Sequence, residues 1–144
     1  MSRFLLLPLA LLAIQAHAEE TAGMVKVAKG SVTLERKGGL VDATVGSPVL
    51  VSDRIHTGSE GVIGITLRDN TCISAGPNSF LVMEKFSYDT TTQKGNMDVN
   101  INRGTVSVVS GKLAKASPEN VIFRTPSSVL GLRGTEFAVE VRGK

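Results

Sequence analysis

Residues 61–86 read GVIGITLRDNTCISAGPNSFLVMEKF, and this stretch decides the fold class. Apolar and polar side chains alternate in three runs, one ending at Leu67, one passing through Ile73 and one covering residues 80–86. Asp69-Asn70 and Gly76-Pro77-Asn78 separate the runs with residues typical of turns. Because successive side chains of a strand point to opposite faces, this period of two predicts consecutive strands joined by tight turns.

The same alternation extends to both sides of this stretch. Further strands are expected around residues 25–27 and 32–34 with a turn at Gly38-Gly39, in a pair broken at Arg103-Gly104, and over residues 135–141. Residues 111–120 predict only a short connector, and residues 88–96 a polar, exposed loop. We therefore expect an all-β domain of many short antiparallel strands. It would form a two-sheet sandwich of jelly-roll type, or a short rolled barrel or β-helix-like fold.

The first 18 residues have the features of a secretory signal peptide. Arg3 precedes an apolar run over residues 4–14, and Ala16-His17-Ala18 resembles a cleavage site. The alternative is an uncleaved N-terminal anchor, but an apolar run of this length is too short to cross a bilayer, which takes about 20 residues. We therefore expect a mature chain of residues 19–144, folded as one domain without a membrane span, in the periplasm or secreted.

Charge and cysteine content limit the partners and the chemistry of such a chain. One of the 16 Lys and Arg residues, Arg3, lies in the predicted signal peptide, which leaves 15 basic against 13 acidic side chains. With no basic run, one Tyr and no Trp, the chain lacks the stripe and stacking rings of a nucleic-acid surface. Cys72 is the single cysteine. It is expected to be a small buried apolar residue, with pairing to a second chain or reaction as a free thiol as the alternatives.

No pattern of residues predicts catalysis, a metal or a cofactor. Asp53, His56 and Ser59 are three residues apart, so neighbours among them should point to opposite faces of a strand rather than form a triad. The mature chain has one His and one Cys, too few for a zinc site. Gly131 and Gly134 precede a strand, whereas phosphate-binding glycine loops open a helix. Paired carboxylates could still come from distant strands, but nothing marks any acid as special.

Residues 125–141, TPSSVLGLRGTEFAVEV, place a cation within an apolar run. Pro126 should end the preceding strand, and Gly131 and Gly134 permit a sharp change of direction around Arg133. One interpretation is a structural corner, in which the guanidinium satisfies backbone carbonyls or Glu136. The alternative is an anion-binding nest. We favour the corner, formed by Thr125, Pro126, Gly131, Arg133, Gly134, Thr135 and Phe137.

Four segments together resemble the FecR domain family. They are GSVTLER, GSPVLVSDRIHTGSEGVIGITLRDNTCISAGPNSFLVMEKF, INRGTVSVVSG and VIFRTPSSVLGLRGTEFAVEV. The family motif falls on Asp53, Ile55, Thr57, Gly58, Asp69, Gly104, Thr125, Pro126, Arg133, Gly134, Thr135 and Phe137. Leu132 replaces the usual valine, and Asn70-Thr71 replaces the usual Gly-Ser of the hairpin. Asn tolerates the left-handed conformation that glycine would supply, so the turn should survive.

The resemblance implies an all-β domain outside the cytoplasmic membrane. In the best-known members this domain belongs to a membrane-spanning regulator that reports the state of an outer-membrane receptor to a sigma factor. This sequence shows no internal membrane helix, so we do not expect it to carry a signal across the membrane by itself. We expect a non-catalytic module that binds another envelope protein, with no partner-binding residue assigned. The alternative is a cell-wall or glycan-binding module, against which the low aromatic content argues.

Overall fold

The computed structural model describes residues 20–131 and 136–142. The described residues form twelve strands and very little helix, which confirms the all-β prediction. The strands are β1 (Thr21–Lys29), β2 (Val32–Arg36), β3 (Gly39–Asp42), β4 (Pro48–Leu50), β5 (Arg54–Thr57), β6 (Val62–Leu67), β7 (Cys72–Ala75), β8 (Phe80–Tyr88), β9 (Gly95–Val109), β10 (Val121–Arg124), β11 (Val129–Gly131) and β12 (Glu136–Val141). The helix α1 (Lys112–Ala116) and the 3-10 turn η1 (Pro118–Asn120) occupy the predicted connector.

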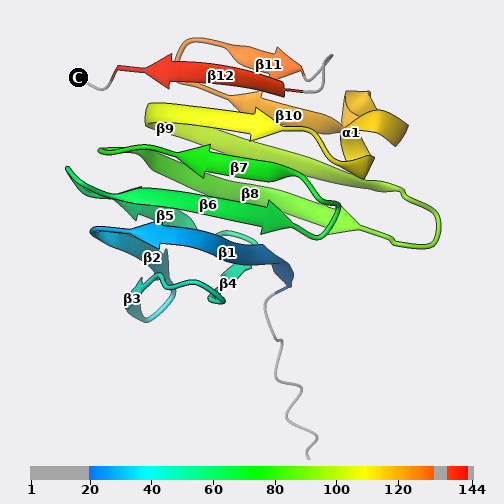
Figure 1. The fold of residues 1–144 in the computed structure, drawn as a ribbon. Coiled ribbons are helices and arrows are strands. Elements are labelled where there is room, and N and C mark those ends of the chain that lie inside the picture. Colours follow the sequence, from blue (N-terminus) through cyan, green and yellow to red (C-terminus); the bar gives the residue numbers. More distant parts are fainter. Residues whose placement is uncertain (1–19, 132–135, 143–144) are drawn as a thin grey trace, which may run out of the picture.

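The strands form two layers that share one strand. Sheet A has the order β4-β1-β6-β7-β9-β12, and sheet B has the order β3-β2-β5-β8-β9-β10-β11. In Figure 1, sheet A faces the viewer and most of sheet B lies behind it. Because β9 belongs to both sheets, the whole is a single curled sheet, a sandwich closed along one strand.

The bend in β9 lies at the predicted break, but it is not a turn between two strands. The prediction of a strand pair there was wrong, because β9 runs without interruption through 15 residues. Its first part pairs with β8, and its last part pairs with β7 and β12. Inward-facing residues have odd numbers up to Ile101 and even numbers from Val106. A bulge opposite Phe80 and Leu81, followed by Gly104 at a φ of 103°, produces this change of face.

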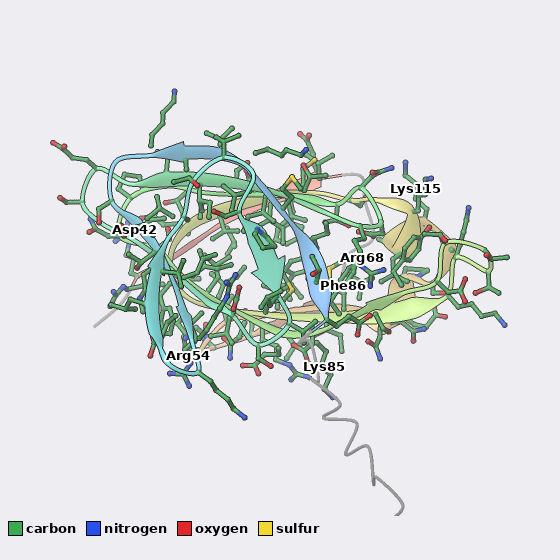
Figure 2. All side chains as sticks on the ribbon, turned by 90° about the horizontal axis from the view of Figure 1, so that it is seen from below. Asp42, Arg54, Arg68, Lys85, Phe86 and Lys115 are labelled. Carbon is green, nitrogen blue, oxygen red and sulfur yellow. The ribbon has the colours of Figure 1, made fainter. Side chains whose placement is uncertain are left out.

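The core lies between the inner faces of the two sheets. Its larger apolar residues are Val25, Ile63, Ile65, Leu67, Ile73, Val106 and Val108 from sheet A, and Leu34, Ile55, Leu81, Met83, Val99, Ile101 and Phe123 from sheet B. In Figure 2, which views the molecule from below, Phe86 lies between the layers, whereas Arg54 and Lys85 lie along the lower side. The alternation seen in the sequence therefore corresponds to an inward apolar face and an outward polar face on most strands.

One strand pair departs from the predicted antiparallel arrangement. β10 lies parallel to the first part of β9, with Phe123 opposite Val99. A parallel neighbour needs a crossover connection, and residues 110–120, with α1 and η1, provide it. Phe123 is fully buried and makes an edge-to-face contact with Phe137 of β12, at 5.2 Å between ring centroids. This contact joins the two sheets at the C-terminal end of the sandwich.

Candidate functional site

Asp53, in the first part of the FecR-type motif, closes the turn between β4 and β5. Its carboxylate accepts bonds from Arg36 Nε at 2.8 Å and Arg36 Nη2 at 3.0 Å, and from the Leu50 amide at 2.8 Å. Arg36 also donates to the Pro48 carbonyl at 2.6 Å. Asp53 is 1% exposed and Arg36 is 20% exposed at the side chain. All these bonds lie within the fold, so Asp53 acts as a structural anchor.

Asp69 anchors the turn between β6 and β7 and also binds the helix α1. Asp69 is fully buried, and its carboxylate accepts bonds from the Thr71 amide, the Thr71 hydroxyl and the Leu113 amide, at 3.1, 2.8 and 3.1 Å. Asn70 has a φ of 71°, which confirms that this Asn supplies the left-handed conformation of the turn. The Leu113 amide belongs to the first turn of α1, where backbone N–H groups lack helical partners. One carboxylate therefore shapes a hairpin turn and holds the connector in place.

Thr57 joins the end of β5 to the turn before β8. Its hydroxyl donates to the Gly76 carbonyl at 2.7 Å and accepts from the Ser79 amide at 2.8 Å. Gly104 packs against the same turn: a Cβ atom there would lie about 2.5 Å from both Cα and Cβ of Ser79. The motif residues at these two positions thus allow β9 to bend close to the turn.

The candidates for catalysis do not come together. Asp53 points inward with its bonds satisfied, whereas His56 lies on the outer face of sheet B, bonded to Glu35 at 3.0 Å and stacked on Phe80. Ser59 is exposed in the next turn. Asp53, just before β5, and His56, within it, therefore point to opposite sides of the sheet, as predicted. Within the described ranges there is no group of three or more His, Cys, Asp or Glu residues able to hold a metal.

Cys72 differs from the prediction. The thiol is exposed on the outer face of β7, so the expectation of a small buried apolar residue was wrong. The cause is register: Ile73 and Ala75 face the core, which leaves Cys72 and Ser74 outward. Sequence alternation alone allowed either phase for so short a strand.

The predicted C-terminal corner is described only in part. Thr125 forms a turn with Ser128, through its amide to the Ser128 carbonyl at 2.9 Å and through a hydroxyl pair at 2.8 Å, and Pro126 follows the end of β10. Gly131 pairs with Ile122 at the end of β11. Arg133, Gly134 and Thr135 lie outside the described residues, so the corner formed by the seven motif residues stays a prediction.

Arg68 has a structural role that the sequence did not reveal. Its guanidinium donates to the Thr21 carbonyl at 2.7 Å and to Glu20 at 3.0 Å, and it lies 5.4 Å from the centre of the Phe86 ring. Figure 2 shows Arg68 and Phe86 close together. Because Thr21 belongs to β1 and Phe86 to β8, this cation links the two sheets. In the sequence Arg68 is only a charge beside a turn.

The outer faces of the two sheets differ in their chemistry. In the central strands of sheet A, residues 62–67, 72–75 and 104–109 include no charged side chain. The outer face of sheet B carries a hydrogen-bonded pair, Glu35 and His56, and an ion pair, Asp98 and Arg124. Between these pairs lies a groove of about 340 Å³, lined by Ser52, Arg54, Phe80, Val82, Glu84, Asn100 and Asn102. Sequence analysis did not single out the groove, because its lining comes from separate strands and has no motif.

Comparison with known families agrees with the geometry of the motif residues. A family model described as FecR protein matches residues 53–144, which is more than half of the chain. No curated protein and no solved structure matches the chain. The FecR family is regulatory, associated with the cell envelope and not known for catalysis. Among the described residues no helix is long and apolar enough to cross a membrane. With its turn anchors at Asp53, Thr57 and Asp69, the chain belongs to the FecR family.

Proposed function

We propose that this chain is an exported, non-catalytic module that binds another protein of the cell envelope through the free edge of β12. Support comes first from the described polar residues of the motif, whose side chains make hydrogen bonds within the fold: Asp53, Thr57, Asp69 and Thr125. Throughout the described part of the chain, each buried side-chain nitrogen or oxygen has a hydrogen-bond partner. A site that awaits a substrate usually keeps buried polar groups available. Recognition is therefore expected at the surface.

Export is supported by the sequence and by the position of β1. The predicted signal peptide ends at residue 18, and β1 begins at Thr21. Glu20, the first described residue, already bonds to Arg68. A chain cleaved after residue 18 would retain all the strand pairing that the described residues show for β1 in sheet A. The periplasm is the compartment that fits both this signal and an envelope-associated family.

The edge of β12 is the observation that carries the proposal. Among the described strands β12 pairs only with β9, so its other side presents unpaired backbone groups. It has six residues, whereas the other edge strands, β3, β4 and β11, have four, three and three. A long free edge is a template for an added strand, and proteins use such edges to bind extended segments of their partners.

The side chains of β12 define the chemistry of the added strand. Phe137, Val139 and Val141 face the core and are only half-buried, while Glu136 and Glu140 are exposed on the other face. A partner strand with apolar residues on the inner face and Lys or Arg on the outer face would complement both sides. A second copy fits less well: in the antiparallel register centred on Ala138, Glu136 would lie opposite Glu140 of the other copy.

Site-specific cross-linking in living cells tests the proposal. A photoreactive amino acid replaces Ala138, which is exposed on β12. The matched control replaces Leu40, which is 68% exposed on β3, an edge of the other sheet. We expect one discrete protein adduct from position 138 and none from position 40. The proposal fails if position 138 yields no protein adduct, or if both positions capture the same proteins to the same extent.

A further inference from the structure

The groove on the outer face of sheet B is built from the middle of the sheet. Its lining residues belong to β5, β8 and β9, together with Ser52 of the preceding turn. Arg54 lies opposite Val82, and Val82 lies opposite Asn100, so the groove crosses three paired strands. Most backbone groups at the groove are engaged in sheet pairing, and the exceptions lie at the register breaks at Glu84 and Asn102. The groove therefore offers no continuous free strand edge, and a ligand here has to be recognised mainly by side chains.

The polar side chains of the groove are available for binding. Arg54, Glu84, Asn100 and Asn102 make no side-chain hydrogen bond or ion pair with any other described residue. Glu35 lies opposite Arg54 in the register, yet its carboxylate bonds to His56. The charged residues on either side of the groove are thus paired, while those within it are not. Together the four offer guanidinium donors, carboxylate acceptors and two amides that can do both.

Two apolar side chains, Phe80 and Val82, line the groove, and the Phe80 ring is held in place by a neighbour. Phe80 stacks on His56 at 4.5 Å between ring centroids and 8° between ring planes. His56 is bonded in turn to Glu35, so the ring is held before any ligand arrives. A pre-positioned apolar surface reduces the entropy lost on binding. The low aromatic content of the sequence argues against a glycan ligand, but the structure places one of the few aromatic rings, Phe80, beside Val82 in this groove.

We propose that this groove binds a neutral oligosaccharide. Arg54 and Glu84 offset each other, so the groove does not select a strongly anionic or cationic ligand. A sugar ring presents hydroxyl groups at its rim and C–H groups on its face. The hydroxyl groups can form hydrogen bonds with the planar polar side chains of the groove. The C–H face can pack against Phe80 and Val82. The groove lies on a different sheet from β12, so a chain could hold a glycan and a protein partner at once.

Nuclear magnetic resonance titration of the purified protein tests the groove directly. The probes are chitotetraose and maltotetraose, added separately to about 10 mM, which exceeds the millimolar Kd expected for a small open groove. With at least one probe, we expect shift changes to cluster at residues 80–84 and 100–102. Because no net charge is involved, raising the salt concentration should leave the Kd unchanged.

Variants separate the groove from the rest of the surface. Asn100→Ala combined with Asn102→Ala should weaken binding at least about tenfold, because two amide partners are lost. Ser107→Ala is the matched control, since Ser107 is exposed on the same strand but on the outer face of sheet A. Thermal unfolding of both variants checks that the fold is retained.

Several results would overturn the inference. They are the absence of shift changes with both sugars, shift changes located away from the groove, equal loss of binding in the Ser107→Ala control, or unchanged binding in the double variant. Preferential binding of an extended peptide in the groove would also overturn it. The protein adduct at position 138 is independent of these outcomes. Loss of sugar binding with that adduct retained would therefore leave the proposed protein-binding function intact.

Discussion

The turn between β6 and β7 and the loop between β8 and β9 begin with the same local device. In each, an Asp side chain accepts the backbone amide two residues later: Asp69 from Thr71 at 3.1 Å, and Asp89 from Thr91 at 2.8 Å. Asp69 is fully buried and also bonds to the helix α1, whereas Asp89 is exposed and bonds only within its own loop. The same local hydrogen bond thus helps to connect distant elements at Asp69, whereas at Asp89 it stabilises only the loop itself.

Asp53 is an intermediate case. It is as buried as Asp69, but its main partner is Arg36, which reaches solvent. Removing Asp53 therefore leaves a cation that water can hydrate and the amide of Leu50, a partly exposed residue. Removing Asp69 instead leaves buried amide and hydroxyl groups without their partner. Burial of the groups left behind, rather than the local turn, should set the energetic cost of losing each aspartate.

The largest effect is expected for Asp69→Ala. It removes three hydrogen bonds, one of them to the connector, and leaves buried donors without partners, so we expect a loss of about 3–5 kcal/mol in the free energy of unfolding. Urea unfolding followed by circular dichroism measures it. Asp69→Asn keeps one acceptor oxygen for the Thr71 amide and should lose less. A loss no greater than that of Asp53→Ala would contradict the comparison.

A smaller loss is expected for Asp53→Ala. Arg36 keeps its bond to the Pro48 carbonyl and can be hydrated, so we expect about 2–3 kcal/mol, measured in the same way. Added salt should weaken the Arg36–Asp53 attraction only slightly, because the carboxylate is buried. Equal losses in the free energy of unfolding for Asp53→Ala and Asp69→Ala would show that the exposure of Arg36 does not reduce the loss caused by Asp53→Ala.

Thr71→Val tests whether the Thr71 hydroxyl helps to hold the connector against the turn at Asp69. The Thr71 hydroxyl donates to Asp69 at 2.8 Å and accepts from the Gly111 amide at 3.2 Å, and valine has nearly the same shape. We expect a loss of about 1–2 kcal/mol, because one buried amide is left without its partner. Amide hydrogen exchange should show faster exchange at Gly111 in particular. Unchanged protection there would mean that the hydroxyl does not hold the connector.

The smallest effect is expected at Asp89. Bonds from the Thr92 and Thr91 amides lower the pKa of this carboxyl below its ordinary value of 3.8. Because the folded pKa is the lower one, the contribution to stability is complete above pH 3.8 and is lost as the pH falls through the folded pKa. Carboxyl titration by nuclear magnetic resonance measures the shift. Asp89→Ala should therefore lower the unfolding midpoint at neutral pH, but by less than Asp53→Ala does, because the loop is exposed. A shift as large as that of Asp53→Ala would refute the contrast.

Several elements could be predicted because their signals are local. The Asp69-Asn70 turn follows from residue types that favour a left-handed conformation, and the inward face of β12 follows from a period of two. The connector at residues 111–120 was also predicted, since it lacks any long periodic pattern. In the loop predicted over residues 88–96, the flanking strands extend further than expected, because Tyr88 and Gly95 still pair.

Other features could not be read from the sequence. A glycine after a strand signals a hairpin and a bulge equally well, so the course of β9 through Gly104 was not predictable. The phase of β7, which exposes Cys72, depends on its pairing with β6 and β9. Asn100 and Asn102 became candidates only when Arg54 and Glu84 were found on neighbouring strands.

By itself, the sequence determined the all-β class, the positions of most turns and the FecR family, because alternation and turn chemistry act between residues close in the chain. Only the tertiary structure decided that β9 serves two sheets, that Asp69 holds the connector, and that four unpaired polar side chains line one groove. These depend on strand order and register, which bring together residues far apart in sequence. A single chain carries no local signal for such pairings, since the contacts form only when both sheets are complete.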